Sequence, residues 1–287
     1  MRGSDAVRVA AHTRTRLGEG PHWAAAEDSV YWVDILGHRL HRLHLASGQH
    51  AIWPMPEPIC WLVERADGDG WLAGFASGMA RLTLDPFSIG PITPLAPPSP
   101  DHRLNDAKVD RAGRLWAGVM QNEGAIATGG LYRVAGGQIA RADDGYLVPN
   151  GPAISVDGAW LYHADSPRRL IYRFAIAADG TLHDRRIHVR FADDWGVPDG
   201  MTVDAEGHLW VAHWDGGCVS RFDPDGQRVR VVPVPASRPT SPCFGGARLD
   251  RLFVTSAADG CDGEPLAGAL FEIDPGVAGL PPVPFAG

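Results

Sequence analysis

The chain has 287 residues, 45% of them hydrophobic, and carries a formal net charge of -8 with a pI near 5.8. This acidic balance argues against a nucleic-acid or anionic-membrane surface, because both would repel the protein, and it favours a small diffusing substrate. The four cysteines form no CxxC pair, no apolar run is long enough to span a membrane, and the first residues lack the apolar core of a secretory signal. We therefore expect a cytoplasmic protein with reduced thiols, and a monomer.

An apolar strand core of one kind recurs six times along the chain. The intervals between its copies are 41 to 49 residues, close to the blade length of roughly 40 to 50 residues that is typical of propellers. The copies are SVYWVD, GWLAGF, RLWAGV, WLYHAD, LWVAHW and RLFVTS, anchored on Tyr31, Leu72, Trp116, Leu161, Trp210 and Phe253.

Each copy belongs to a unit of four short apolar segments separated by turn residues. The fourth segment is visible in AIWPM, PITPLA, QIARAD, RIHVRF and RVRVVPV. Four consecutive strands of this kind form an antiparallel meander, which is one propeller blade. The sequence therefore predicts an all-β fold, a six-bladed β-propeller, forming a single domain over residues 1–287.

The last unit lacks a clear fourth segment, since it ends in PPVPFAG, while an unassigned alternating stretch, AVRVAAHT (6–13), precedes the first unit. Pairing that stretch with the last blade would close the ring and remove an exposed strand edge, so we predict this closure. The Pro-rich segment 94–102 is interpreted as an ordered loop that crosses between the second and third blades.

Polar residues recur at the start of the innermost strands. Counting back 11 residues from three of the anchors gives Asn105, Asn150 and Asp199, and counting back 12 from Tyr31 gives Glu19. Equivalent positions of the innermost strands form one ring around the central channel, so these side chains should face one another. The alternative for any one of them is a polar residue that caps a turn, but chance explains four at one register poorly.

The predicted ring brings two carboxylates and two carboxamides into one small space. Such oxygen donors would repel one another if left alone, and a divalent cation would relieve the repulsion. Ca, Mg and Mn suit oxygen ligands best, while Zn and Fe stay open. In the other two blades the same count gives Trp61 and Pro242, which should wall the site; the other tryptophans are interpreted as core residues.

Loops that leave the anchor strands should overhang the same end of the channel. Arg103 belongs there too, either gripping substrate oxygens or paired to Asp101 or Asp106 on the rim. His163 and His213 lie on anchor strands, where core packing is the better interpretation than a metal site. The overhanging loops carry Asp34, Glu123, Asp165 and Asp215.

Five motifs, taken together and in order, resemble the gluconolactonase and senescence-marker (regucalcin-like) family, and especially its bacterial sugar-lactone lactonases. The likeness covers nearly the whole chain. The motifs are LGEGPHW (17–23), HRLNDAKVDRAGRLWAG (102–118), NGPAIS (150–155), PDGMTVDAEGHLWVAHW (198–214) and PTSPCFGG (239–246).

The resemblance implies a six-bladed propeller with one catalytic metal ion, whose ligands match Glu19, Asn150 and Asp199. It also implies that Arg103 and Asn105 contact substrate. Glu123 occupies the place of a further substrate-binding glutamate, although its surroundings, MQNEGAIATGG, match the family more loosely.

The function that follows is hydrolysis of a sugar lactone to its sugar acid, with Asp199 as general base or a metal-activated hydroxide as the competing nucleophile. One alternative is a non-enzymatic calcium-binding or protein-docking propeller with a structural metal ion. Esterase or phosphotriesterase activity at the same site is a third hypothesis.

Overall fold

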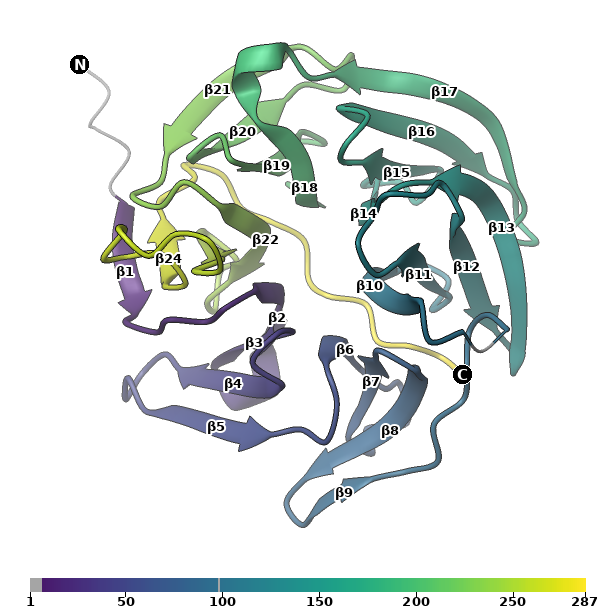
Figure 1. The fold of residues 1–287 in the computed structure, drawn as a ribbon, viewed down its shortest axis with the longest axis horizontal. Coiled ribbons are helices and arrows are strands. Elements are labelled where there is room, and N and C mark those ends of the chain that lie inside the picture. The colour runs from purple at the N-terminus through teal and green to yellow at the C-terminus, as the bar shows by residue number, and fades with distance from the viewer. Residues whose placement is uncertain (1–6, 98) are drawn as a thin grey trace.

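The computed structural model describes residues 7–97 and 99–287 and consists of six four-stranded antiparallel sheets arranged in a ring (Figure 1). This confirms the predicted six-bladed β-propeller. Two short 3-10 helices, η1 (Ala25–Glu27) and η2 (Asp193–Trp195), interrupt the strand pattern. No helix among the described residues is long and apolar enough to cross a membrane.

Every blade has its strands in consecutive order from the channel outward, except that the last blade takes its outermost strand from the N-terminal end of the chain. The strands are, blade by blade, β2 (Gly18–Ala24), β3 (Ser29–Asp34), β4 (Arg39–His44) and β5 (His50–Pro54); β6 (Ile59–Glu64), β7 (Trp71–Phe75), β8 (Gly78–Leu84) and β9 (Phe87–Ile89); β10 (His102–Val109), β11 (Leu115–Gln121), β12 (Gly129–Ala135) and β13 (Gln138–Tyr146); β14 (Pro149–Ile154), β15 (Trp160–Asp165), β16 (Leu170–Ile176) and β17 (Leu182–Arg190); β18 (Val197–Val203), β19 (Leu209–Trp214), β20 (Cys218–Phe222) and β21 (Arg228–Pro233); β22 (Pro239–Gly245), β23 (Arg251–Ser256), β24 (Leu270–Ile273) and β1 (Val7–Ala11).

The N-terminal strand closes the ring as predicted. β1 pairs antiparallel with β24, with Val7 opposite Ile273 and Arg8 opposite Glu272. The Glu272 carboxylate accepts hydrogen bonds from Arg8 at 2.7 Å and from Arg251 of β23 at 2.7 Å, which ties the N-terminal strand to β24 and β23. Of the predicted closing stretch, Ala6 lies outside the described residues.

The predicted fourth strand of the second blade, PITPLA (91–96), is wrong. The outermost strand is instead β9, only three residues long, and Thr93 contributes an isolated bridge to Met79. Pro91 and Pro94 have no backbone N–H to donate to a ladder, which explains why the pairing ends early. The segment 94–102 then crosses to the third blade, and within it Pro98 lies outside the described residues.

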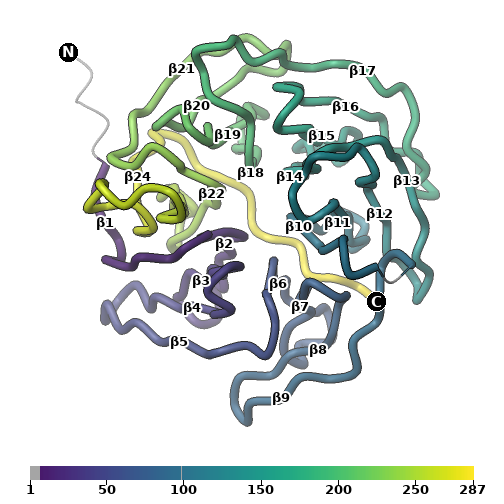
Figure 2. Tube along the Cα trace, viewed as in Figure 1, coloured from purple at the N-terminus to yellow at the C-terminus, as the bar shows by residue number. Residues whose placement is uncertain are grey.

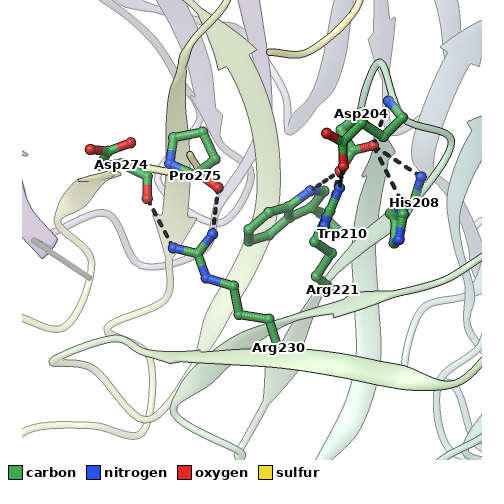
Figure 3. Close-up of polar contacts among 8 residues, drawn as sticks. Asp204, His208, Trp210, Arg221, Arg230, Asp274 and Pro275 are labelled. Carbon is green, nitrogen blue, oxygen red and sulfur yellow. Dashed lines mark hydrogen bonds and ion pairs between the residues drawn. The ribbon is translucent and has the colours of Figure 1, made fainter. Parts of the chain in front are cut away.

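Two of the turns that precede anchor strands hold their tryptophans by the same contact. The Trp116 indole N–H donates to Asp110 at 2.8 Å, and the Trp210 indole N–H donates to Asp204 at 2.8 Å. Arg221 of β20 also donates to Asp204, at 2.7 Å (Figure 3). Both tryptophans are fully buried, so each aspartate satisfies a polar group that would be costly to leave unpaired in the core.

After β24 the chain leaves the last blade and crosses the ring (Figures 1 and 2). Its start is held by Arg230 of β21, which donates to the carbonyl oxygen of Asp274 at 3.1 Å and to that of Pro275 (Figure 3). We call residues 274–287 the C-terminal tail.

The tail contacts turns at the ends of several innermost strands. Isolated bridges join Gly279 to Asp204 and Phe285 to Arg65, and Phe285 is buried in the core of the second and third blades. These turns lie where the innermost strands end. The tail therefore covers the end of the channel opposite to the one where the innermost strands begin.

Candidate active site

All six innermost strands contain one extra residue near their beginning. In β2, for example, Glu19 pairs with Val33 and His22 with Tyr31, so three steps along β2 oppose two along β3. A bulge of this kind bends a strand and re-aims its side chains. The register shifts between Glu19 and His22, Ile59 and Trp61, Leu104 and Ala107, Asn150 and Ala153, Pro198 and Met201, and Pro239 and Pro242.

The four predicted ring residues lie in or beside these bulges, and all are buried. Asn105 and Asn150 are in direct contact, because the Asn105 amide donates to the Asn150 side-chain oxygen at 2.6 Å. The same amide donates to the Pro149 carbonyl at 2.9 Å, and the Asn150 amide donates to the Ser166 hydroxyl at 2.9 Å. These bonds fix the orientation of both carboxamides.

The two ring carboxylates interact through their charges. Burial, followed by the neighbouring carboxylates of Asp199 and Asp106, raises the pKa of Glu19 well above its usual value. Burial and then Asp106 raise the pKa of Asp199 in the same direction. Both groups are thus held where their ionised forms are unfavourable unless a cation joins them.

The donor set fits a divalent cation. Among residues 7–97 and 99–287, no three His, Cys, Asp or Glu side chains are close enough to hold a metal ion by themselves. A site here therefore needs the carboxamide oxygen of Asn150 together with Glu19 and Asp199. Two buried carboxylates and one amide oxygen suit hard cations, and the repulsion between the carboxylates is what such an ion would remove.

Glycine follows three of the four ring residues in the sequence, and it allows the innermost strands to approach closely. A Cβ on Gly200 would lie 2.2 Å from the Ser241 hydroxyl of the next blade, so no side chain fits there. Gly151 has a φ of 70° and lies against Met201 of the next blade. The residue that follows Asn105 is instead Asp106.

Asp106 lies beside the ring, and the sequence prediction did not include it among the ring residues. It is buried, lines the channel, and accepts a hydrogen bond from the Ala107 backbone at 2.7 Å. The other three ring residues are each followed by glycine, so an aspartate after Asn105 is the signal that could have identified it. Ser166, the partner of Asn150, gave no such signal.

Arg103 binds its own segment rather than a rim carboxylate, so the alternative of pairing to Asp101 or Asp106 is wrong. Its Nη1 atom donates to the Leu104 carbonyl and to the Asn105 side-chain oxygen, both at 2.8 Å. The guanidinium also interacts with the Cys60 thiol of the second blade. Within the described part of the chain, no carboxylate is bonded to it.

A hollow of about 230 Å³ lies next to Arg103, beneath the crossing segment 94–102. Glu123 is exposed in the turn after β11, and that turn is bonded to the crossing segment, because the backbone N–H of Asn122 donates to Asp101 at 2.8 Å. The structure therefore places Glu123 on the same rim as Arg103, but in no hydrogen bond with the other site residues.

The carboxylate oxygens of the other loop aspartates are already engaged in hydrogen bonds or ion pairs, so they are not free at the channel mouth. Asp34 accepts backbone hydrogen bonds from Arg16 and Leu17 at 3.0 Å, and Asp165 accepts from Leu147 at 3.2 Å and pairs with Arg168 at 2.7 Å. Each of these two aspartates therefore connects the segment that enters an innermost strand to the turn that follows the second strand of the same blade.

The remaining loop carboxylate, Asp215, pairs with Arg238 at 2.6 Å on the surface.

Trp61 lines the channel cavity together with Asp106, but its indole is turned into the blade. Its ring lies over Gly74 of β7, where a Cβ would come within 2.1 Å of the indole, and it belongs to the hydrophobic core. Glycine at position 74 provides the space that draws the ring into the blade. His163 and His213 are fully buried, as expected for core packing.

With this geometry established, comparison with known proteins identifies the family. The family model described as SMP-30/Gluconolactonase/LRE-like region matches residues 17–258. The chain belongs to this family. All five motifs that carried the resemblance lie inside the matched region, which also contains every ring residue.

Relatives in the SMP-30/gluconolactonase family cover nearly the whole chain. A pentonolactonase of Haloferax volcanii is 36% identical over 280 residues, which cover 94% of each chain. A 6-deoxy-6-sulfogluconolactonase of Pseudomonas putida is 36% identical and covers 94% of this chain and 95% of its own. The solved structure of a calcium-binding protein, regucalcin, from Agrobacterium tumefaciens matches with a TM-score of 0.91 at 30% identity and covers 98% of both chains.

Proposed function

We propose that this protein is a metal-dependent sugar-lactone lactonase, which hydrolyses an aldonolactone to the corresponding sugar acid. The observation that carries the proposal is the buried pair of carboxylates, Glu19 and Asp199, at the mouth of a propeller channel. No cationic side chain among residues 7–97 and 99–287 is bonded to either. Lactonases among the family members listed above support the reaction class.

Glu19, Asn150 and Asp199 are the residues proposed to hold one divalent ion, of which Ca, Mg, Mn, Zn and Fe are the candidates. When bound, such an ion supplies a Lewis acid that stabilises negative charge on a lactone carbonyl oxygen as water adds. The hydrogen bond from Asn150 to Ser166 supports this assignment, because it fixes which side of the carboxamide presents oxygen to the channel.

Arg103 is proposed to orient the lactone, because its guanidinium is bonded to no carboxylate among the described residues and can donate to substrate oxygens. Asn105 holds both Arg103 and Asn150 in place through its side chain and is proposed to contact substrate as well. Glu123 is proposed to accept hydrogen bonds from sugar hydroxyls that enter the hollow beside Arg103.

Asp199 is the proposed general base. Its buried carboxylate at the channel mouth can accept the proton that a water molecule loses as it attacks the carbonyl carbon. The ring C–O bond then breaks, and the freed ring oxygen takes up a proton to become the hydroxyl of the sugar acid. A single domain, a monomeric state and a cytoplasmic location stay predictions from the sequence.

The test is acid release from a panel of five- and six-membered aldonolactones, followed with a pH indicator. The wild-type protein reconstituted with Mn²⁺ should hydrolyse at least one lactone well above the spontaneous rate, whereas Asp199→Asn should not. Metal-dependent melting without any lactone hydrolysis would instead support the alternative, a propeller with a structural ion. An Asn150→Ala protein that binds metal normally would refute the ligand assignment.

A further inference from the structure

The chain contains 26 lysine and arginine residues, and only one of them, Lys108, is a lysine. It lies on β10, three residues after Asn105, and is half-buried. Among residues 7–97 and 99–287, no hydrogen-bond or ion-pair partner binds its ammonium group. A lone lysine inside the channel of an arginine-rich protein calls for a physical explanation.

The strand register places Lys108 in a second ring, one layer deeper in the channel than the site. Six residues pair directly with the six anchors, one in each blade, and all six line a cavity of about 110 Å³ that the tail residues Leu280 and Val283 help to enclose. These residues are His22, Val63, Lys108, Ile154, Thr202 and Cys243. Apart from His22, which faces Glu64 at 3.3 Å, Lys108 is the ring member that can carry charge at neutral pH.

Asp106 lines the same cavity and connects this ring to the site. Burial raises the pKa of Asp106 to about 6, and the charge of Lys108 is the largest influence that opposes this rise. Asp106 in turn acts on the carboxylates of Glu19 and Asp199. It therefore adds a third negative charge to a site whose ligand set already contains two.

Lys108 is the cation that acts on Asp106, whereas the charge of Arg103 acts on Glu19 and Asp199. A divalent ion offsets two of the three carboxylates, and one negative charge remains in a closed, poorly solvated space. An uncompensated buried charge is strongly unfavourable. A protein can supply the missing positive charge with a second metal ion or with a side chain. Arg111 also lines this cavity, but Lys108 is the cationic side chain that acts on the carboxylate in excess.

We propose that Lys108 is a built-in cation of the channel, which balances Asp106 and takes the place of a second metal ion beneath the site. The proposal rests on the metal site of the proposed function, but not on the reaction catalysed there. Lys108 is thus a positioning residue, and it restricts the channel to one divalent ion.

Two measurements on chelated protein test this proposal without using lactone hydrolysis. The first is urea unfolding of wild type, Lys108→Met, Asp106→Asn and the double variant. Lys108→Met should lower the unfolding midpoint, and Asp106→Asn should raise the midpoint by more in the Lys108→Met background than in wild type, because the carboxylate that it removes is then unpaired. Independent, additive effects of the two substitutions would overturn the proposal.

The second measurement is calorimetric titration with Mn²⁺ alone. We expect one Mn²⁺ per chain in wild type and in Lys108→Arg, and two in Lys108→Met. Thr202→Val is the matched control, since it changes the same ring without changing charge, and it should also bind one ion. One Mn²⁺ in Lys108→Met, with unchanged affinity, would overturn the proposal. Loss of Mn²⁺ binding by wild type would refute the metal site, while the unfolding experiment would still measure the coupling between Lys108 and Asp106.

Discussion

The buried Asp106 provides a quantitative test of the charge balance in the channel. Burial raises the pKa of this carboxyl to about 6 from an ordinary value of 3.8. A carboxyl whose folded pKa is raised favours folding while it is protonated, and this advantage is lost as the pH rises through the folded pKa. At about 1.4 kcal/mol for each pKa unit, ionised Asp106 costs the metal-free protein about 3 kcal/mol at pH 8.

Asp106→Asn should therefore stabilise the chelated protein by about 3 kcal/mol at pH 8, and by only about 0.5 kcal/mol at pH 4, where the wild-type carboxyl is protonated in the folded state. For a chain of this length, 3 kcal/mol corresponds to a rise of about 5 °C in melting temperature. Urea unfolding at both pH values, in excess chelator, measures the difference. Adding Mn²⁺ should reduce the stabilisation that Asp106→Asn gives at pH 8. A variant that is less stable than wild type at pH 8 would refute this reasoning.

Three further predictions concern the core, the tail and the rim. Burial lowers the pKa of His163 to about 3. Between pH 8 and pH 5 the unfolded histidine takes up a proton, so wild type should lose about 2 kcal/mol of unfolding free energy relative to His163→Leu in urea unfolding. Equal pH profiles of the two proteins would contradict this. Phe285→Ala should cost about 3 to 5 kcal/mol of unfolding free energy, because the side chain is buried. The control, Ile126→Ala at an exposed position, should cost less than about 0.5 kcal/mol. Equal losses would show that the tail is not anchored. Glu123→Gln should raise KM about tenfold with unchanged Mn²⁺ stoichiometry, whereas an unchanged KM would remove Glu123 from the substrate site.

The architecture could be predicted because repetition reveals it. Six copies of one strand core, spaced about a blade apart, determine the number of blades, and the unpaired stretch before Glu19 finds its partner because an open edge is unfavourable. The same repetition places Glu19, Asn105, Asn150 and Asp199 at equivalent positions. Side chains at equivalent positions of a closed ring necessarily approach one another.

Details that depend on packing could not be predicted in this way. The register count that located Asn105 also selected Trp61, but glycine at position 74 opens a space in the blade that the indole fills. Asp34 and Asp165 fit a site by composition, yet their oxygens are used by backbone N–H groups of neighbouring loops. The sequence pattern shows where along a strand a side chain is attached, but it does not show which group that side chain contacts.

The tail and the second ring were missed for a different reason. The last residues have no counterpart in the other blades, so periodicity says nothing about a segment that crosses the ring. Lys108 belongs to a predicted motif, but its meaning depends on the depth of its strand position in the channel. That depth follows from the bulge in β10, which is a feature of the strand pairing.

The central claim is that one divalent ion, held by Glu19, Asn150 and Asp199, is required for lactone hydrolysis. Its most direct test is to add Mn²⁺ stepwise to fully chelated protein while following acid release from an aldonolactone. The rate should rise in proportion to Mn²⁺ and level off at one equivalent per chain, and Asp199→Asn should stay inactive throughout. Hydrolysis at the full rate before any Mn²⁺ is added would contradict it.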